Sequence, residues 1–247
     1  MFAPRKRSRR SRISIAPAPT SITAFVGAFA AGPEAQAVYV SSVAELEATF
    51  GSDPGDAHDA VVQFFANGGT DAWVVRGGAD DLAALDGVDV INLLTLPGMC
   101  NAPSAPALAA GTAYCAARRA FFIADPPAGL ASADDALAWI ADPAVAAERS
   151  DLCAVYFPEL VLASGGTAAP SGTLAGIYAS CTAPWQAAGS GAALNGVAGL
   201  TVTISDDDSA LLAAAGINGI STLSSIAVAL TMSSDPESKY VSVRRLA

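Results

Sequence analysis

The sequence has a single histidine, His58, and two lysines, Lys6 and Lys239, among its 247 residues. A Ser-His-Asp or Cys-His catalytic arrangement needs an imidazole as its base, and a phosphate-binding loop of the G-x-x-x-x-G-K-[ST] type needs a lysine after glycine. Neither lysine stands in such a motif. His58 lies between Asp56 and Asp59 at the start of a predicted helix, where we expect an exposed first-turn residue. The sequence therefore offers no active site of these kinds.

The sequence also lacks a metal-binding pattern. Its four cysteines contain no C-x-x-C pair, which together with the single histidine argues against a zinc site. We expect them to be buried, reduced thiols. The acidic residues 206–208 could form a cation site. Three acids at a helix start also suit the positive end of the helix macrodipole, and we interpret them in this second way. No cofactor is expected. The cysteines are Cys100, Cys115, Cys153 and Cys181.

Long apolar runs are absent, although 52% of the residues are hydrophobic and only 15% are charged. The longest candidate, residues 217–232, is interrupted by Asn218, Gly219 and three serines, and it falls short of the roughly 18 apolar residues that a membrane span needs. The basic start of the chain has no apolar stretch after it, so it is not a secretory signal. We expect a globular protein without membrane insertion.

The charge is divided unevenly along the chain. Residues 13–247 hold 7 basic and 23 acidic residues, a formal charge of 7 − 23 = −16. Such a body repels nucleic acid. The basic start could bind nucleic acid, act as a localisation-like patch, reach onto the acidic body of a neighbouring copy, or remain a solvated end. Its six cations are Arg5, Lys6, Arg7, Arg9, Arg10 and Arg12.

Strand and helix signals alternate along the rest of the chain. The clearest is a helix over 57–67, because its apolar residues recur at helical period and glycines close it. Ser42 with Glu45 forms a capping box for a helix through Phe50. Alternation of this kind predicts a three-layer α/β domain with a mostly parallel sheet. The predicted strands are 21–27, 38–40, 72–76, 88–96, 120–124, 152–157 and 200–204. Four other helices are predicted: one that ends near Arg119, one from a Ser132 cap to about Ile140, one over 174–180, and one from an Asp206 cap to Gly216. Residues 183–199 are expected to be loop.

These elements resemble, in order, the core of contractile tail sheath proteins from phages and phage-tail-like injection systems. Phe64-Phe65-Ala-Asn-Gly-Gly69, followed by Ala72-Trp-Val-Val-Arg76, is similar to an F-F-x-N-G-G…A-x-V-V-R segment of that family. The resemblance covers roughly residues 20–246. Its further segments are 20–27 with 32–33, 89–98, 113–127, 154–158, 170–178, 216–218, and 234 with 239–246.

The resemblance implies a structural role with no chemistry. A subunit of this kind polymerises helically around an inner tube and contracts to drive the tube through a target envelope. The implied partners are other sheath subunits, the tube protein, and baseplate and terminator proteins, in a virion tail or similar particle assembled in the bacterial cytoplasm. The implied architecture is subtilisin-like without a catalytic triad. Terminal arms that add a strand to a neighbour's sheet would supply contacts, and the extended segment 13–20, with Ile13 and Ile15, is placed to be one.

The chain departs from the family pattern in three places. The basic start is outside the resemblance, 221–232 lacks the expected tryptophan-containing strand, and the C-terminal sheath domain is apparently missing. We therefore expect a tail and arm over 1–19 and a sheath core over 20–247. Two alternatives stay open: a sheath-related accessory such as a cap, baseplate protein or truncated paralogue, and an α/β enzyme, which would require a ligand pocket with converging polar groups.

Overall fold

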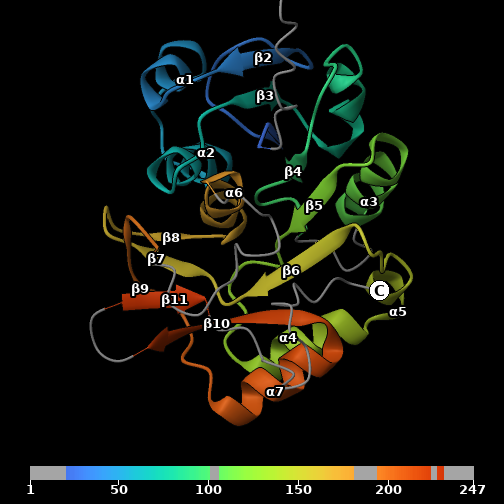
Figure 1. The fold of residues 1–247 in the computed structure, drawn as a ribbon, viewed down its shortest axis with the longest axis vertical. Coiled ribbons are helices and arrows are strands. Elements are labelled where there is room, and N and C mark those ends of the chain that lie inside the picture. Colours follow the sequence, from blue (N-terminus) through green and yellow to red (C-terminus); the bar gives the residue numbers. More distant parts are fainter. Residues whose placement is uncertain (1–20, 101–105, 181–193, 224–226, 231–247) are drawn as a thin grey trace, which may run out of the picture.

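The computed structural model describes residues 21–100, 106–180, 194–223 and 227–230. Its strands and helices alternate as the sequence predicts (Figure 1). The strands are β1 (Thr23–Gly27), β2 (Ala37–Val40), β3 (Ala72–Arg76), β4 (Leu93–Thr95), β5 (Phe121–Ala124), β6 (Cys153–Phe157), β7 (Leu160–Leu162), β8 (Thr167–Ala168), β9 (Val197–Leu200), β10 (Ile217–Leu223) and β11 (Ala227–Leu230). The helices are α1 (Val43–Phe50), α2 (Asp56–Ala66), the 3-10 helix η1 (Ala79–Leu85), α3 (Pro106–Arg118), α4 (Ala133–Ala141), α5 (Pro143–Ala146), α6 (Ser171–Ser180) and α7 (Asp206–Ala215).

Eight strands form the main sheet in the order β11-β10-β6-β5-β4-β1-β3-β2. Only the two outermost pairs, β10 with β11 and β2 with β3, are antiparallel. The five inner pairs are parallel. This confirms the predicted α/β fold with a mostly parallel sheet. A second sheet, in the order β8-β7-β9, is antiparallel throughout.

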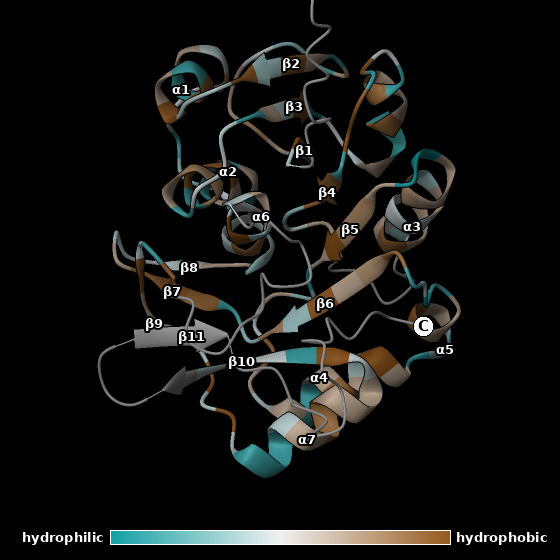
Figure 2. Cartoon of the chain, in the orientation of Figure 1, coloured by the Kyte–Doolittle hydropathy of each residue, from teal (hydrophilic) through white to brown (hydrophobic). Residues whose placement is uncertain are grey.

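The sheet is covered on both faces, which makes the domain three layers thick. Successive residues of β6 point to opposite sides: Cys153 and Val155 join one buried cluster with α3 and α4, while Ala154 and Tyr156 join the other with α2 and α6. The helices of the two clusters flank the sheet (Figure 1), and the apolar ribbon segments gather along the inner strands (Figure 2). A sheet buried on both faces needs continuous apolar strands, and these strands supply them.

Helices α2 and α6 pack unusually close together because two glycines of α6 face α2. A Cβ atom on Gly172 would lie 2.2 Å from the Ala60 carbonyl oxygen, and one on Gly176 would lie 2.4 Å from the Phe64 carbonyl oxygen. Side chains at these two positions would push the helices apart. The predicted helix 57–67 thus becomes a buried element, with Phe64 fully inside the core.

Several predicted boundaries are wrong for identifiable reasons. The apolar run 88–96 is a strand only at Leu93–Thr95, because Val88 and Ile91 pack into the core from an irregular segment. The strand expected at 200–204 lies at Val197–Leu200, where β9 pairs with β7, so the end of the expected loop 183–199 is strand. Helix α7 is capped by Ser205 and not by Asp206, since the Asp208 amide donates to Ser205 Oγ.

Other elements carried too weak a local signal to be predicted. Strands β7 and β8 are three and two residues long and meet at a Gly165-Gly166 turn with positive φ at both glycines. Strand β10 contains Asn218 and Gly219, residues that are depleted in strands, but the Asn218 amide donates to the Val155 carbonyl oxygen at 3.0 Å. The unpredicted elements are η1, α5, β7, β8, β10 and β11. The expectations for residues 1–20, 183–193 and 231–247 lie outside the described residues.

Candidate assembly surfaces

The single histidine is buried, contrary to the expectation of an exposed first-turn residue. His58 is 8% exposed, because α1 packs beside the first turn of α2. Its Nδ1 lies 3.1 Å from Asp59 Oδ1, and its Nε2 lies 3.9 Å from Glu47 Oε1 without a hydrogen-bond partner. Both neighbours are carboxylates, so the described contacts of this imidazole include no serine or cysteine that it could activate.

The described cysteines are buried, free thiols, as the sequence predicts. They are Cys100, Cys115 and Cys153, while Cys181 lies outside the described residues. Burial raises the pKa of the Cys100 and Cys115 thiols to about 12 and that of the Cys153 thiol well above its usual value. Because the thiolate is the nucleophile and metal ligand, burial disfavours the reactive form of these groups. Within the described ranges, no three His, Cys, Asp or Glu side chains are grouped to hold a metal ion.

A hollow of about 350 Å³ lies where β1 and β3 end. Its polar side chains already have partners within the chain. Arg76 Nη1 donates to the Gly32 carbonyl oxygen at 2.9 Å, Arg76 Nη2 lies 3.3 Å from Glu34 Oε1, and Asp81 Oδ2 accepts from the Gly78 amide at 2.7 Å. The hollow therefore lacks free polar groups that converge on a ligand. It is lined by Ala28, Phe29, Glu34, Ala35, Arg76, Gly77 and Asp81.

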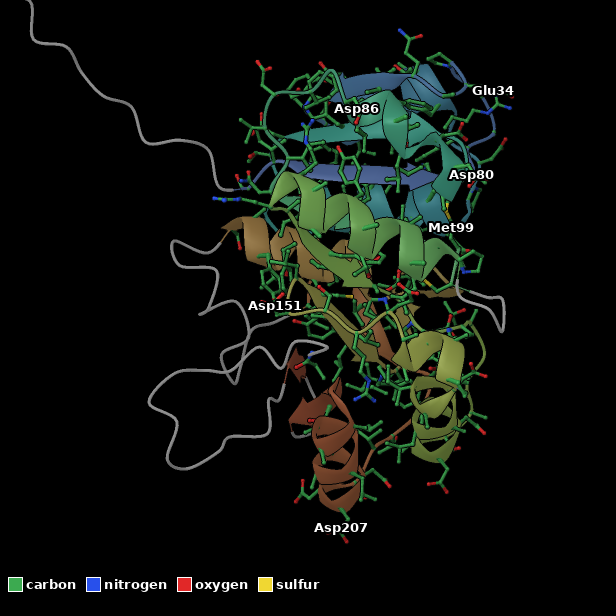
Figure 3. All side chains as sticks on the ribbon, turned by 90° about the vertical axis from the view of Figure 1, so that its right-hand side faces the viewer. Glu34, Asp80, Asp86, Met99, Asp151 and Asp207 are labelled. Atoms are coloured by element: carbon green, nitrogen blue, oxygen red, sulfur yellow. The ribbon has the colours of Figure 1, made fainter. Side chains whose placement is uncertain are left out.

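Acidic residues far outnumber basic ones in the described part of the protein. The described residues contain four arginines and 21 acidic residues, a formal charge of 4 − 21 = −17. Figure 3 shows Glu34 and Asp80 on one side of the molecule, Asp86 and Asp151 on the opposite side, and Asp207 at the far end. Two of the arginines are engaged internally: Arg76 pairs with Glu34, and Arg118 donates to the Asp86 and Val88 carbonyl oxygens. The surface field is consequently negative.

The acids at helix starts have a local cause. Asp208 Oδ2 accepts from the Ser205 amide at 3.0 Å, and Asp135 Oδ2 accepts from Ser132 Oγ at 2.9 Å. The Asp208 bond pairs the backbone amide of the Ser205 cap, as in a capping box, and the Asp135 bond pairs the hydroxyl of the Ser132 cap. The Asp208 carboxylate is held by Ser205, whose hydrogen bonds lower its pKa. The acidic residues 206–208 are therefore a helix start, as predicted.

Strand β2 is an open edge of the main sheet. It pairs with β3 on one side, and on its other side no described strand lies. Its residues, Ala37-Val-Tyr-Val40, include no charge and no proline, the usual protections of a sheet edge. Tyr39 is 47% exposed, lies against Trp73 with ring centroids 5.5 Å apart, and donates from its hydroxyl to Asp71. The edge is thus uncharged, and its exposed residue, Tyr39, packs against Trp73.

The predicted contact residues of the arm and tail cannot be placed on these surfaces. Arg5, Lys6, Arg7, Arg9, Arg10, Arg12, Ile13 and Ile15 all lie outside the described residues. The described chain starts at residue 21, and β1 enters the middle of the sheet. The β2 edge is a surface that the sequence pattern did not predict. Its signal was present in the uncharged alternation of residues 37–40, but nothing local shows that a strand will be outermost.

The fold defines the class of the protein: a three-layer α/β domain with a mostly parallel main sheet. No helix in the described part of the chain is long and apolar enough to cross a bilayer. No protein-family model matches the chain, and no curated protein matches it.

Solved structures share the fold over nearly the whole chain. The helical sheath of the anti-feeding prophage in its contracted state is 22% identical, with a TM-score of 0.67 over 99% of this chain and 72% of that one. A chain of the six-fold symmetrised baseplate of the same particle is 23% identical, with a TM-score of 0.67 over 99% and 72%. A sheath tail protein from Desulfitobacterium hafniense is 9% identical, with a TM-score of 0.59 over 90% and 73%. The chain has the fold of contractile tail sheath proteins, as the sequence resemblance implied.

Proposed function

We propose that the protein is a structural subunit of a contractile tail sheath, which polymerises helically around an inner tube and contracts to drive that tube through a target envelope. The observation that carries this proposal is the fold match to a helical sheath over 99% of the chain. The buried thiols, the buried histidine and the internally paired hollow give no support to an α/β enzyme. The proposed partners are other sheath subunits, the tube protein, and baseplate and terminator proteins, in a tail-like particle assembled in the cytoplasm.

A second candidate is a sheath-related accessory, because a chain from a baseplate structure matches equally well. The two differ in copy number and position. A sheath subunit forms an open helical array, since heterologous contacts that do not close give filaments, whereas a baseplate component or cap occupies one end. Immunogold labelling of particles purified from the source bacterium separates them. Labels along the tail support the sheath role, labels at one end support the accessory, and unlabelled particles contradict both.

The basic start is proposed to dock on the acidic body of an adjacent subunit. Six cations lie in the first 12 residues and the described body carries 21 acids, so two copies attract where tail meets body. The contact is expected to be strongest at low salt, because the Debye length is about 8 Å at physiological ionic strength and shorter above it. We infer a division into a tail and arm over 1–19 and a core over 20–247.

The test replaces Arg5, Lys6, Arg7, Arg9, Arg10 and Arg12 with glutamine. Self-association of this variant, measured by sedimentation velocity, is expected to be weaker than that of the wild type at low salt and similar at high salt. A Ser8→Ala, Ser11→Ala variant controls for change within the same segment without loss of charge. Equal association of all three proteins at low salt would show that the tail is a solvated end.

The arm 13–20 is proposed to add a strand to the sheet of a neighbour. Ile13 and Ile15 alternate as in a strand, whereas Pro17 and Pro19 restrict the segment to an edge position. The β2 edge fits this role because it is uncharged and carries the exposed Tyr39. A Tyr39→Lys change places a charge on that edge and is expected to weaken association at every salt concentration. That salt independence distinguishes the arm contact from the tail contact, and an effect confined to low salt would contradict it.

A further inference from the structure

The main sheet has two ends, which differ in charge. Strands β1, β3, β4, β5, β6 and β10 run in the same direction, so all six begin at one end of the sheet, the amino end, and finish at the other, the carboxyl end. Asp86 and Asp151 precede β4 and β6, and they lie on the side of the molecule opposite to Asp80, which follows β3 (Figure 3). The two ends are therefore separate surfaces of one subunit.

The carboxyl end presents acidic side chains. Helices η1 and α4 start there, after β3 and β5, and each carries acids in its first turn. Asp80 and Asp134 are exposed in these turns, whereas the acid after each of them accepts a hydrogen bond from the cap residue. The described arginine at this end, Arg76, pairs with Glu34 at 3.3 Å. No described cation at this end is left to offset Asp80 and Asp134.

The amino end holds the other three arginines of the described residues. Arg118 ends α3 and Arg119 follows it, just before β5, while Arg149 stands before β6, the strand next to β5. Arg118 donates to two backbone carbonyl oxygens. Arg119 and Arg149 are exposed, and within the described ranges neither guanidinium has a hydrogen bond or an ion pair. Asp86 and Asp151 share this end, yet the two arginines are the described cations that a second molecule can reach without breaking an internal contact.

Arg119 occupies a backbone conformation that suits glycine better. Its φ is +56°, in the left-handed region, where helices commonly end on a glycine. Helix α7 does so at Gly216, with φ +92°. A cation near a helix end also suits the macrodipole, but Arg118 already supplies one in the last turn of α3. The described contacts of Arg119 do not offset the strain, and strained residues cluster where a side chain has a function.

We propose that Arg119 and Arg149 form one half of a head-to-tail contact, in which the amino end of one subunit binds the acidic carboxyl end of a second copy, around Asp80 and Asp134. The proposal rests on the proposed function, because it names the surfaces that join subunits in the polymer. Acidic surfaces of two copies repel each other, so the free arginines decide which surfaces meet. The contact joins two different surfaces, and it repeats into an open array when the rotation between copies does not close.

The first experiment compares the full wild-type chain with an Arg119→Gln, Arg149→Gln variant by sedimentation velocity at low salt. Exposed ion pairs are individually weak, so the loss of two is expected to raise the dissociation constant of self-association about 2- to 30-fold. An Ala44→Glu, Ala48→Glu variant is the control, because it lowers the net charge by the same two units at exposed positions of α1. It is expected to associate like the wild type.

Equal association of the arginine variant and the control overturns the head-to-tail contact, and so does a wild type that stays monomeric at low salt. Labelling of purified particles tests the sheath role separately, so a failure of the contact can be told apart from a failure of the proposed function.

A second experiment exchanges the charges. An Arg119→Glu, Arg149→Glu variant carries acids at both ends, and an Asp80→Arg, Asp134→Arg variant carries arginines at both ends. Each variant alone is expected to associate more weakly than the wild type, because like charges meet. Their equimolar mixture is expected to recover association, because opposite charges meet again. A mixture that associates no more strongly than its two components overturns the proposal.

Arg119→Gly separates the contact from the stability of the fold. Glycine adopts the left-handed conformation without strain, so the melting temperature is expected to rise, whereas self-association is expected to weaken because the cation is lost. A raised melting temperature with weakened association supports the proposal. Unchanged association of this variant overturns the role of Arg119.

Discussion

The amide of Asn195 donates a hydrogen bond of 2.8 Å to Oδ1 of Asn67, across 128 positions of the chain. The Asn67 side chain also donates to the Asn195 and Gln63 carbonyl oxygens, at 3.1 and 2.8 Å. Asn67 stands at the end of α2, and Asn195 precedes β9. One amide side chain thus closes a helix and anchors the segment that enters the second sheet.

Asn67→Ala is expected to reduce the free energy of unfolding by about 1 to 3 kcal/mol, because it leaves the Asn195 amide without its described acceptor. The measurement is denaturant unfolding followed by circular dichroism. Gln36→Ala removes an amide side chain from an exposed position and serves as the control. Equal stability of the two variants would show that the Asn67 contacts contribute nothing beyond those of a solvated amide.

Gly176→Ala tests the close approach of α6 to α2. Alanine is favoured over glycine in a helix by about 1 kcal/mol, so local propensity alone predicts a gain in stability. The added Cβ would lie 2.4 Å from the Phe64 carbonyl oxygen, and overpacking of this kind costs about 1 to 3 kcal/mol. A net loss is therefore expected. Gly87→Ala, where a Cβ meets nothing within 4 Å, should show no such loss, and a gain at Gly176 would contradict the packing.

His58→Ala is expected to destabilise the protein by about 1 to 2 kcal/mol, beyond the roughly ±0.5 kcal/mol usual for surface positions. The reason is the burial of the imidazole between α1 and α2, where it is only 8% exposed. Chemical denaturation of wild type and variant measures the effect. Asp53→Ala, at an exposed neighbouring position, is the control. If His58→Ala changed the free energy of unfolding by no more than a surface substitution does, His58 would be an exposed first-turn residue, as the sequence predicted.

The three described thiols are expected not to react with a disulfide reagent in the native protein at pH 8. Their burial raises each thiol pKa far above that pH. The reagent therefore cannot reach the sulfur atoms, and the reactive thiolate is not formed. A Cys181→Ser variant leaves only these three cysteines for the assay. We expect no rapid reaction without denaturant and release of three equivalents with it. Rapid reaction of the native variant would contradict the buried positions.

The sequence by itself determined the elements whose signals are local. The apolar period of residues 57–65 specified α2, because one face of a helix must be buried. Ser132 and Ser42 specified helix starts, since their hydroxyls accept from amides three residues ahead, at 3.1 and 3.3 Å. Here the structure adds one detail: Glu45 Oε2 accepts from the Ser41 amide and hydroxyl, at 2.8 and 2.9 Å, where a strict capping box would use Ser42. The alternation of strands and helices was sufficient for the fold class.

Only the tertiary structure decided features that depend on distant partners. Strand β9 forms at Val197–Leu200 because it pairs with β7. Strand β10 tolerates Asn218 because the side-chain amide of Asn218 donates a hydrogen bond to β6. His58 is buried because α1 packs over it, which its acidic neighbours in the sequence did not indicate. Asp125 gave no sign of its burial, since its partner Ser171 is 46 positions away. Local propensity is a property of a few adjacent residues, whereas burial and strand pairing are set by segments that meet only after folding.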